Sequence, residues 1–301
     1  MLPEDGERTM APGIYIHAGA HRTGTSSFQA CLALNRPRLE AAGFDLAYPG
    51  RDGAEGGRLA LRLPHPRHRK TPDEGWIAGV QDTLGAHMTP GRSMVLSEEN
   101  IAGRMFHFYQ GQFFPAVRRR ATVLAAGLPL PLRHVLIVVR PYDALFVSAY
   151  RKRAEDNPVP PFGEIAEAMA GIDRGWPAVI TAFRRRLRPE RLTVIDYALR
   201  GESRELLARL LPEGAVTGLE EPGRAWNLSA TDTALAALQA RYRAGETLAR
   251  AEWQAVIAEH AEARADLGFA RFTPEQAGRL AESYAQDLAT IGGMKGVTLI
   301  A

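Results

Sequence analysis

The sequence predicts an α/β fold in which a mostly parallel central sheet is flanked by helices. Short runs of β-branched and aliphatic residues alternate with longer segments that have helical spacing. The chain has 301 residues, of which 46% are hydrophobic and 24% are charged. This composition is ordinary for a globular protein and excludes disordered, collagen-like and disulfide-rich classes. Because no apolar run approaches the ~18 residues that a membrane helix needs, no membrane insertion is expected.

The expected elements alternate over the first two thirds of the chain. Strands are expected at 13–18, 44–48, 93–97, 134–139 and 192–196, and helices at 26–42, 73–87, 113–126, 142–154 and 162–187. After about residue 200 the strand pattern disappears, and helices are expected at 230–243, 251–266 and 274–291. Turn residues mark loops at 49–69 and 157–161. We expect one domain over 13–301 with a helical C-terminal third, preceded by a frayed tail at 1–12.

The charge and the cysteine content limit which binding partners and which cellular compartment we expect for the protein. The formal charge is +3, and three of the 37 basic residues are lysines, which leaves 34 arginines. Basic clusters occur at 67–70, 118–120 and 184–186. The last two lie in helix-like segments without interleaved aromatics, so we expect solvated helix faces and no nucleic-acid partner. A lone Cys31 fits a small buried apolar side chain and a reducing, cytoplasmic location.

A glycine-bracketed turn follows the first strand and precedes a helix. Its sequence is Gly19-Ala20-His21-Arg22-Thr23-Gly24-Thr25-Ser26-Ser27. Such a turn directs backbone N–H groups and the positive helix end toward an anion. The spacing of Gly19 and Gly24 is that of the nucleoside-triphosphatase loop, but Thr25-Ser26 stands where that loop needs Lys-[Ser/Thr]. The turn therefore predicts a phosphate site, with a simple glycine turn capped by serine or threonine as the alternative.

The same turn resembles the 5′-phosphosulfate loop of the sulfotransferases, especially the bacterial ones. This resemblance implies the P-loop nucleotide-kinase-like sulfotransferase fold and 3′-phosphoadenosine 5′-phosphosulfate (PAPS) as co-substrate, without a metal. The loop residues it assigns to PAPS binding are His21, Arg22, Thr23, Gly24, Thr25, Ser26 and Ser27. Arg22 occupies the position of the family's usual catalytic lysine, which is the main departure. A guanidinium is bulkier than an ammonium, so impaired or absent catalysis is an open alternative.

A second motif lies at the end of the strand expected at 134–139. Arg140 follows this strand directly, and Ser148 comes eight residues later on the next helix. The pair resembles the sulfotransferase 3′-phosphate motif, in which an arginine fork and a hydroxyl bind the 3′-phosphate. The alternative is a surface pair of Arg140 with Asp143 and a buried helical serine.

Two further groups complete the expected site. Glu98 and Glu99 end an apolar run whose carboxyl end should face the same cleft, and either could act as the general base. The alternative for both is a solvated turn or a pair with an arginine. Arg224, Asn227 and Ser229 resemble the late segment that covers the 3′-phosphate and adenine, with helix capping by Ser229 as the alternative.

These motifs together predict transfer of a sulfuryl group from PAPS to a hydroxyl or amine on a small-molecule or glycan acceptor. The acceptor pocket is expected in the loops 49–69 and 157–161. The aromatic segment 106–114 either lines that pocket or packs in the core. His65, His68, His107 and His260 lack metal-ligand spacing, so no metal is assigned. The alternatives are a non-catalytic nucleotide-binding module of the same fold and an ATP-dependent kinase-like P-loop protein.

Overall fold

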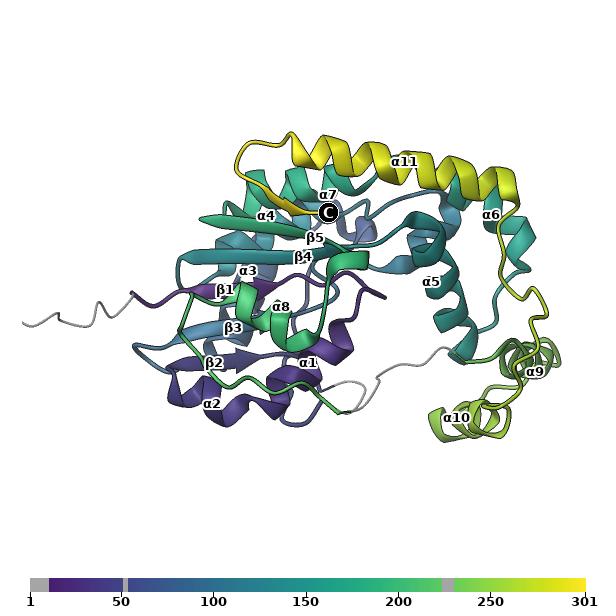
Figure 1. Ribbon diagram of the computed structural model, residues 1–301, viewed down its shortest axis with the longest axis horizontal. Coiled ribbons are helices and arrows are strands. Elements are labelled where there is room, and N and C mark those ends of the chain that lie inside the picture. Colours follow the sequence, from purple (N-terminus) through teal and green to yellow (C-terminus); the bar gives the residue numbers. More distant parts are fainter. Residues whose placement is uncertain (1–10, 51–53, 224–229) are drawn as a thin grey trace, which may run out of the picture.

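A single sheet of parallel strands forms the centre of the protein. The computed structural model describes residues 11–50, 54–223 and 230–301. Its six-stranded sheet has the order β2-β3-β1-β4-β5-β6 (Figure 1). The strands are β1 (Ile14–His17), β2 (Phe44–Ala47), β3 (Ser93–Ser97), β4 (Leu132–Val139), β5 (Arg191–Asp196) and β6 (Thr298–Ile300). Every strand pair is parallel, which confirms the predicted α/β class.

Helices connect the strands and fill the C-terminal region. The α-helices are α1 (Thr25–Leu34), α2 (Arg36–Ala41), α3 (Glu74–Gly85), α4 (Val117–Gly127), α5 (Tyr142–Asp156), α6 (Phe162–Ala170), α7 (Trp176–Ala182), α8 (Ser203–Leu210), α9 (Asp232–Arg243), α10 (Arg250–Glu259) and α11 (Pro274–Gly292). Short 3-10 helices are η2 (Pro66–His68), η3 (Met105–Gln110) and η5 (Tyr197–Leu199), and η4 (Phe183–Leu187) is π-helical.

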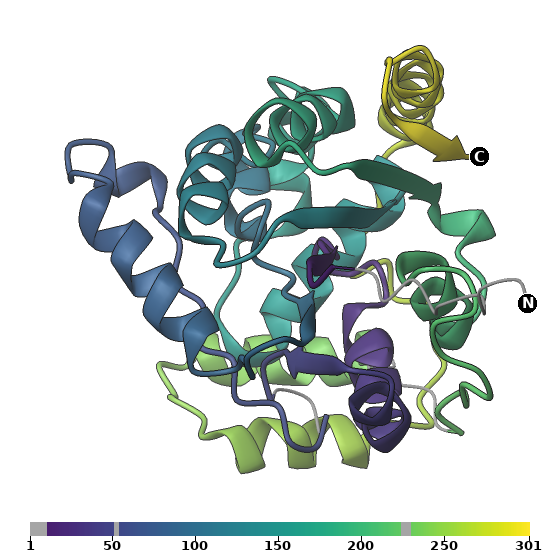
Figure 2. The same cartoon turned by 90° about the vertical axis from the view of Figure 1, so that its left-hand side faces the viewer.

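Helices cover both faces of the sheet (Figure 2). On one face, Leu136 and Val138 pack with α1, α2 and α8. On the other face, Val135 and Ile137 pack against the layer that contains α3, α4, α7 and α11. Burial on both faces explains why β4 reads as a continuous apolar run rather than an alternating one. The pair α9 and α10 packs against α5, away from the sheet (Figure 1).

Three expectations about the elements are wrong in detail. The helix expected at 26–42 is two helices, because Pro37 near the start of α2 lacks an N–H and disfavours continuation of α1. The segment expected as one helix at 162–187 is α6, α7 and η4, with Gly171 ending α6 and Pro177 starting α7. The C-terminal third also ends in a strand, β6, which pairs with β5. Three residues are too few to show a strand periodicity in the sequence.

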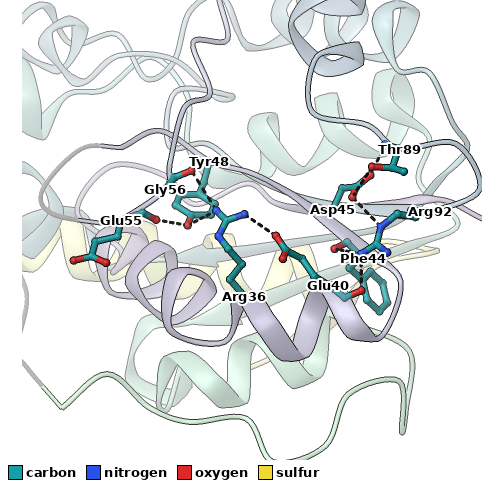
Figure 3. Close-up of polar contacts among 9 residues, drawn as sticks. All are labelled: Arg36, Glu40, Phe44, Asp45, Tyr48, Glu55, Gly56, Thr89 and Arg92. Carbon is teal, nitrogen blue, oxygen red and sulfur yellow. Dashed lines mark hydrogen bonds and ion pairs between the residues drawn. The ribbon is translucent and has the colours of Figure 1, made fainter.

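Polar side chains secure the edge strand β2 (Figure 3). The Nε atom of Arg92 donates to Asp45 at 2.9 Å, and its NH2 atom donates to the carbonyl of Glu40 at 2.6 Å. Arg36 bonds Glu40 at 3.0 Å and the Tyr48 hydroxyl at 2.8 Å. These contacts tie α2 and the chain after β2 to the sheet edge, where unpaired backbone groups would otherwise be open to other strands.

Candidate functional site

The site lies where the connections of the sheet diverge. The strand β1 sits between β3 and β4, and the chain leaves β1 toward β2 on one side but leaves β4 toward β5 on the other. In open parallel sheets, ligands bind in the crevice beyond the carboxyl ends of two such strands. The turn after β1 and Arg140 after β4 meet at this crevice, where both line one cavity.

The turn after β1 is closed by its own hydroxyl groups. The Thr23 hydroxyl donates to the carbonyl of Ala20 at 2.7 Å, and the Thr25 hydroxyl donates to the same carbonyl at 3.3 Å. The N-cap of α1 is Gly24, with φ 97°, and no side chain caps the helix. Gly19 approaches the helix so closely that a Cβ atom there would lie 2.2 Å from the Thr25 hydroxyl. The threonines thus shape the turn instead of capping α1.

A cavity of about 170 Å³ opens in front of this turn. It is lined by His21, Arg22, Gly24, Thr25, Ser26, Ser27, Glu99, Met105, Arg140, Lys152, Tyr197 and Arg200. The lining contains three arginines and a lysine against one carboxylate. Together with the start of α1, these cations make the cavity suited to an anion.

Arg22 and Arg140 are held against each other through the turn. The Nε atom of Arg22 donates to the Ser148 hydroxyl at 2.7 Å, and the NH1 atom of Arg140 donates to the carbonyl of Arg22 at 2.6 Å. Ser148 therefore contacts Arg22 and not Arg140. The ion pairs of the described residues do not include Arg140 with Asp143, which was the alternative for this motif.

Arg140 carries a charge that its surroundings do not fully satisfy. Burial lowers the pKa of its guanidinium, and repulsion by Arg22 and Arg200 adds to this, although Tyr197 and Asp143 oppose it. Its Nε atom is buried without a hydrogen-bond partner. Since buried polar groups are nearly always hydrogen-bonded, this N–H is a candidate donor to a bound ligand.

Arg200 and Tyr197 belong to the site although the sequence analysis missed them. The Arg140 guanidinium lies 4.6 Å from the centre of the Tyr197 ring, and that of Arg200 lies 5.5 Å from it. The NH1 atom of Arg200 is buried without a partner, as is Nε of Arg140. Both residues follow the carboxyl end of β5. Their place after a predicted parallel strand is the signal in the sequence by which they could have been found.

The two adjacent glutamates have different environments. Glu98 is 1% exposed, and its Oε1 atom accepts from the Asn100 backbone at 2.8 Å and from the Asn100 side chain at 2.7 Å. Glu99 lines the cavity, and its Oε2 atom lies 3.2 Å from Nδ1 of His21. The other ring nitrogen of His21 lies 2.9 Å from Oδ1 of Asn100. Of the two candidate bases, the structure places Glu99 at the cavity.

The contacts of His21 affect its protonation. Burial lowers the pKa of His21, but the ion pair with Glu99 and the hydrogen bonds outweigh this, so the pKa lies above its ordinary value. A raised pKa favours the charged imidazolium, which adds positive charge beside Glu99.

Arg120 corrects the expectation that the cluster 118–120 is a solvated helix face. Arg118 is exposed, but Arg120 is only 3% exposed. Its guanidinium donates to the carbonyls of Leu63 at 3.0 Å and Pro64 at 2.7 Å, and also to those of Asn100 and Ile101. Burial lowers the pKa of Arg120 to about 10. This residue braces the segment after β3 that carries the two glutamates.

A second hollow of about 340 Å³ adjoins the cavity. It shares His21, Glu99, Met105 and Lys152 with the cavity. It extends to Asn100, Arg104, Phe106, Tyr109, Ala149, Arg153, Asp156 and Asn157. The aromatic segment is therefore divided, because Phe106 and Tyr109 line the hollow whereas Phe108, Phe113 and Phe114 pack in the core. Of the two expected acceptor loops, 157–161 contributes Asn157, and the described part of 49–69 contributes no lining residue.

Arg224, Asn227 and Ser229, which the sequence analysis assigned to the late segment of the site, lie outside the described residues.

Within the described ranges, no group of three or more histidine, cysteine or acidic residues is arranged to hold a metal ion. No helix of these ranges is long and apolar enough to cross a membrane. Cys31 is fully buried, as expected.

No family model matches the chain, and no curated protein matches it.

Proposed function

We propose that the chain is a sulfotransferase that binds PAPS in the cavity and transfers its sulfuryl group to a hydroxyl or amine in the adjoining hollow. The observation that carries this proposal is the convergence of the turn after β1 with the arginines after β4 and β5. Two of these arginines have buried N–H groups without a partner. One anionic group between these two guanidiniums would accept hydrogen bonds from both, and the turn after β1 offers a second anion site.

The cavity suits the anionic groups of the co-substrate and not the whole molecule. Its volume of about 170 Å³ is below the ~300–1,000 Å³ of pockets that enclose a whole drug-sized ligand. In this proposal, the start of α1 and Arg22 bind the 5′-phosphosulfate. Arg140 binds the 3′-phosphate, and Arg200 adds a second guanidinium on the same side. Ser148 acts through Arg22, whose guanidinium it orients.

The transfer takes place where the cavity and the hollow meet. The acceptor oxygen or nitrogen attacks sulfur and forms a new bond to it, while the bond from sulfur to the bridging oxygen breaks. The acceptor proton passes to Glu99, and adenosine 3′,5′-bisphosphate leaves. Arg22 and Lys152 offset the negative charge that grows on the departing phosphate and the sulfuryl oxygens. Lys152 lines both spaces, and its Nζ atom is held 2.7 Å from Oε2 of Glu155.

A non-catalytic nucleotide-binding module is the second candidate. The observation that favours it is the hydrogen bond from Arg22 to Ser148, which occupies part of the guanidinium at the position of the family's catalytic lysine. This candidate predicts the same affinities but no turnover, so sulfate transfer to a panel of hydroxyl and amine acceptors separates the two.

Calorimetric titration tests the proposed binding. With a chelator present, we expect adenosine 3′,5′-bisphosphate to bind about ten- to a hundredfold more tightly than adenosine 5′-phosphate, because one charged contact contributes ~1.5–3 kcal/mol. Arg140→Ala should reduce this preference, whereas Arg185→Ala on the opposite helical layer should not. Equal affinity for the two nucleotides would refute the 3′-phosphate assignment. Magnesium-dependent binding that favours ATP would support the kinase-like alternative instead.

A further inference from the structure

Six arginines line a groove on the helical layer that lies across the sheet from α1. We call it the arginine groove, and its arginines are Arg118, Arg174, Arg184, Arg185, Arg186 and Arg188. It encloses about 1030 Å³ and lies over α7, η4 and the ends of α4 and α11. These helices pack on the sheet face opposite α1 and α8 (Figure 1). The groove shares no lining residue with the cavity or the hollow of the candidate site.

Tertiary packing brings these arginines together from separate segments. Arg118 lies in the first turn of α4, whereas Arg184, Arg185 and Arg186 are consecutive residues of η4, which packs against both α4 and α7. The wide π-helical turn ends at Arg188, whose φ of 52° is left-handed. Arg118 from one basic cluster of the sequence and all three arginines of another therefore line one concave surface.

The charge of the groove is not balanced by its own residues. Asp173 is the acidic residue of the lining, and its Oδ2 atom is already paired with Arg174 at 2.5 Å. Arg188 donates to the carbonyl of Arg185 at 3.3 Å, and this contact leaves its charge uncompensated. Six arginines against one aspartate leave a formal charge of +5. Gathering like charges in this way costs free energy, which a bound polyanion would offset.

The lining distinguishes among anionic partners. The described lining residues include no aromatic ring on which nucleic-acid bases or sugar rings would stack. The surface is concave and lacks the large apolar side chains that anchor a protein to a flat membrane surface. Instead, Ala178, Ala182 and Met294 offer small apolar contacts, and Thr181 and Thr290 offer hydroxyls. Such contacts suit a peptide backbone, and arginine forks pair with carboxylates in a bidentate manner.

We propose that the arginine groove binds an extended acidic segment of a partner polypeptide. Aspartate and glutamate side chains of the segment pair with the arginines of η4 and with Arg118, and its backbone lies along α7. This binding site is independent of the proposed sulfotransferase activity, so either proposal can fail without the other.

Fluorescence anisotropy with a labelled oligoglutamate peptide tests this site. The test variant is Arg185→Glu/Arg186→Glu, and the matched control is Arg69→Glu/Lys70→Glu, which changes the net charge equally at exposed residues outside the groove. We expect the test variant to weaken binding at least ~tenfold, since each lost charged contact contributes ~1.5–3 kcal/mol. The control should change it by less than about twofold.

Further measurements control for misfolding of the variant and compare other anionic ligands. The neutral variant Arg185→Gln/Arg186→Gln, with an unchanged melting temperature, should show an intermediate loss of peptide affinity. An equal loss in the control variant would overturn the proposal, because binding would then depend on net charge alone. Tighter binding of oligothymidylate, of a sulfated glycan or of phosphatidylserine vesicles at equal charge concentration would also overturn it and would identify the partner class.

Discussion

The contact between Gly24 and Arg200 gives the sharpest test of the site geometry. A Cβ atom at position 24 would lie 2.1 Å from NH1 of Arg200, far inside van der Waals contact. The atom it meets is the far end of a flexible side chain, so Arg200 would move and the backbone would stay. Gly24→Ala is therefore expected to displace Arg200 from the cavity while the turn remains formed.

The size of each effect follows from the structure. Alanine at a left-handed φ of 97° is strained by about 1–2 kcal/mol, which lowers the free energy of unfolding by that amount. Loss of the contact between Arg200 and a bound anion lowers the binding free energy by about 1.5–3 kcal/mol, which is ten- to a hundredfold in affinity. Gly24→Ala should therefore weaken binding of adenosine 3′,5′-bisphosphate about as much as Arg200→Ala does.

A double-mutant cycle isolates the contact. Calorimetry gives the nucleotide affinity, and urea denaturation gives the free energy of unfolding, for Gly24→Ala, Arg200→Ala and the double variant. We expect Gly24→Ala to have little further effect on affinity when Arg200 is already absent, because the two changes remove the same interaction. The decrease in the free energy of unfolding that the backbone strain at position 24 causes should be the same whether residue 200 is arginine or alanine. Fully additive losses of affinity would refute the role assigned to Arg200.

Three further outcomes are expected. Arg22→Ala should slow sulfuryl transfer more than it weakens nucleotide binding, and Arg22→Lys should retain transfer, as measured by kcat and calorimetry in parallel. Arg120→Met should lower the free energy of unfolding in urea by about 3–5 kcal/mol because four carbonyls lose the donor that Arg120 supplies. A loss near zero would contradict this bracing role. Burial lowers the pKa of His17 to about 3 and that of His134 to about 4. Below about pH 6.5 the unfolded chain binds protons that the folded chain does not. The free energy of unfolding should therefore decrease by ~1.4 kcal/mol for each histidine with every unit by which the pH is lowered. His134→Gln should make this dependence weaker when the free energy of unfolding is measured by urea titration between pH 7 and 5.

The sequence by itself determined five of the six strands that the described residues form, the turn and two strand-end arginines. Strands buried on both faces must be apolar throughout, so β3 and β4 stand out as local runs. Glycines at positions 19 and 24 mark the turn because the local backbone there requires them, with a left-handed φ of 97° at Gly24 and a close approach to Thr25 at Gly19. Arg22 and Arg140 could be placed because the carboxyl ends of parallel strands meet at one edge.

Only the tertiary structure decided which side chains share a space. Glu98 and Glu99 are neighbours in sequence, but one is buried against Asn100 and the other lines the cavity. Arg118 and Arg120 belong to one basic run, but one faces the arginine groove and the other braces a core loop. The local pattern is nearly the same in each pair, because helical and strand periodicity reports only which side of an element a residue occupies. What that side faces is set by elements from distant parts of the chain, so burial and charge pairing appear only after these elements pack.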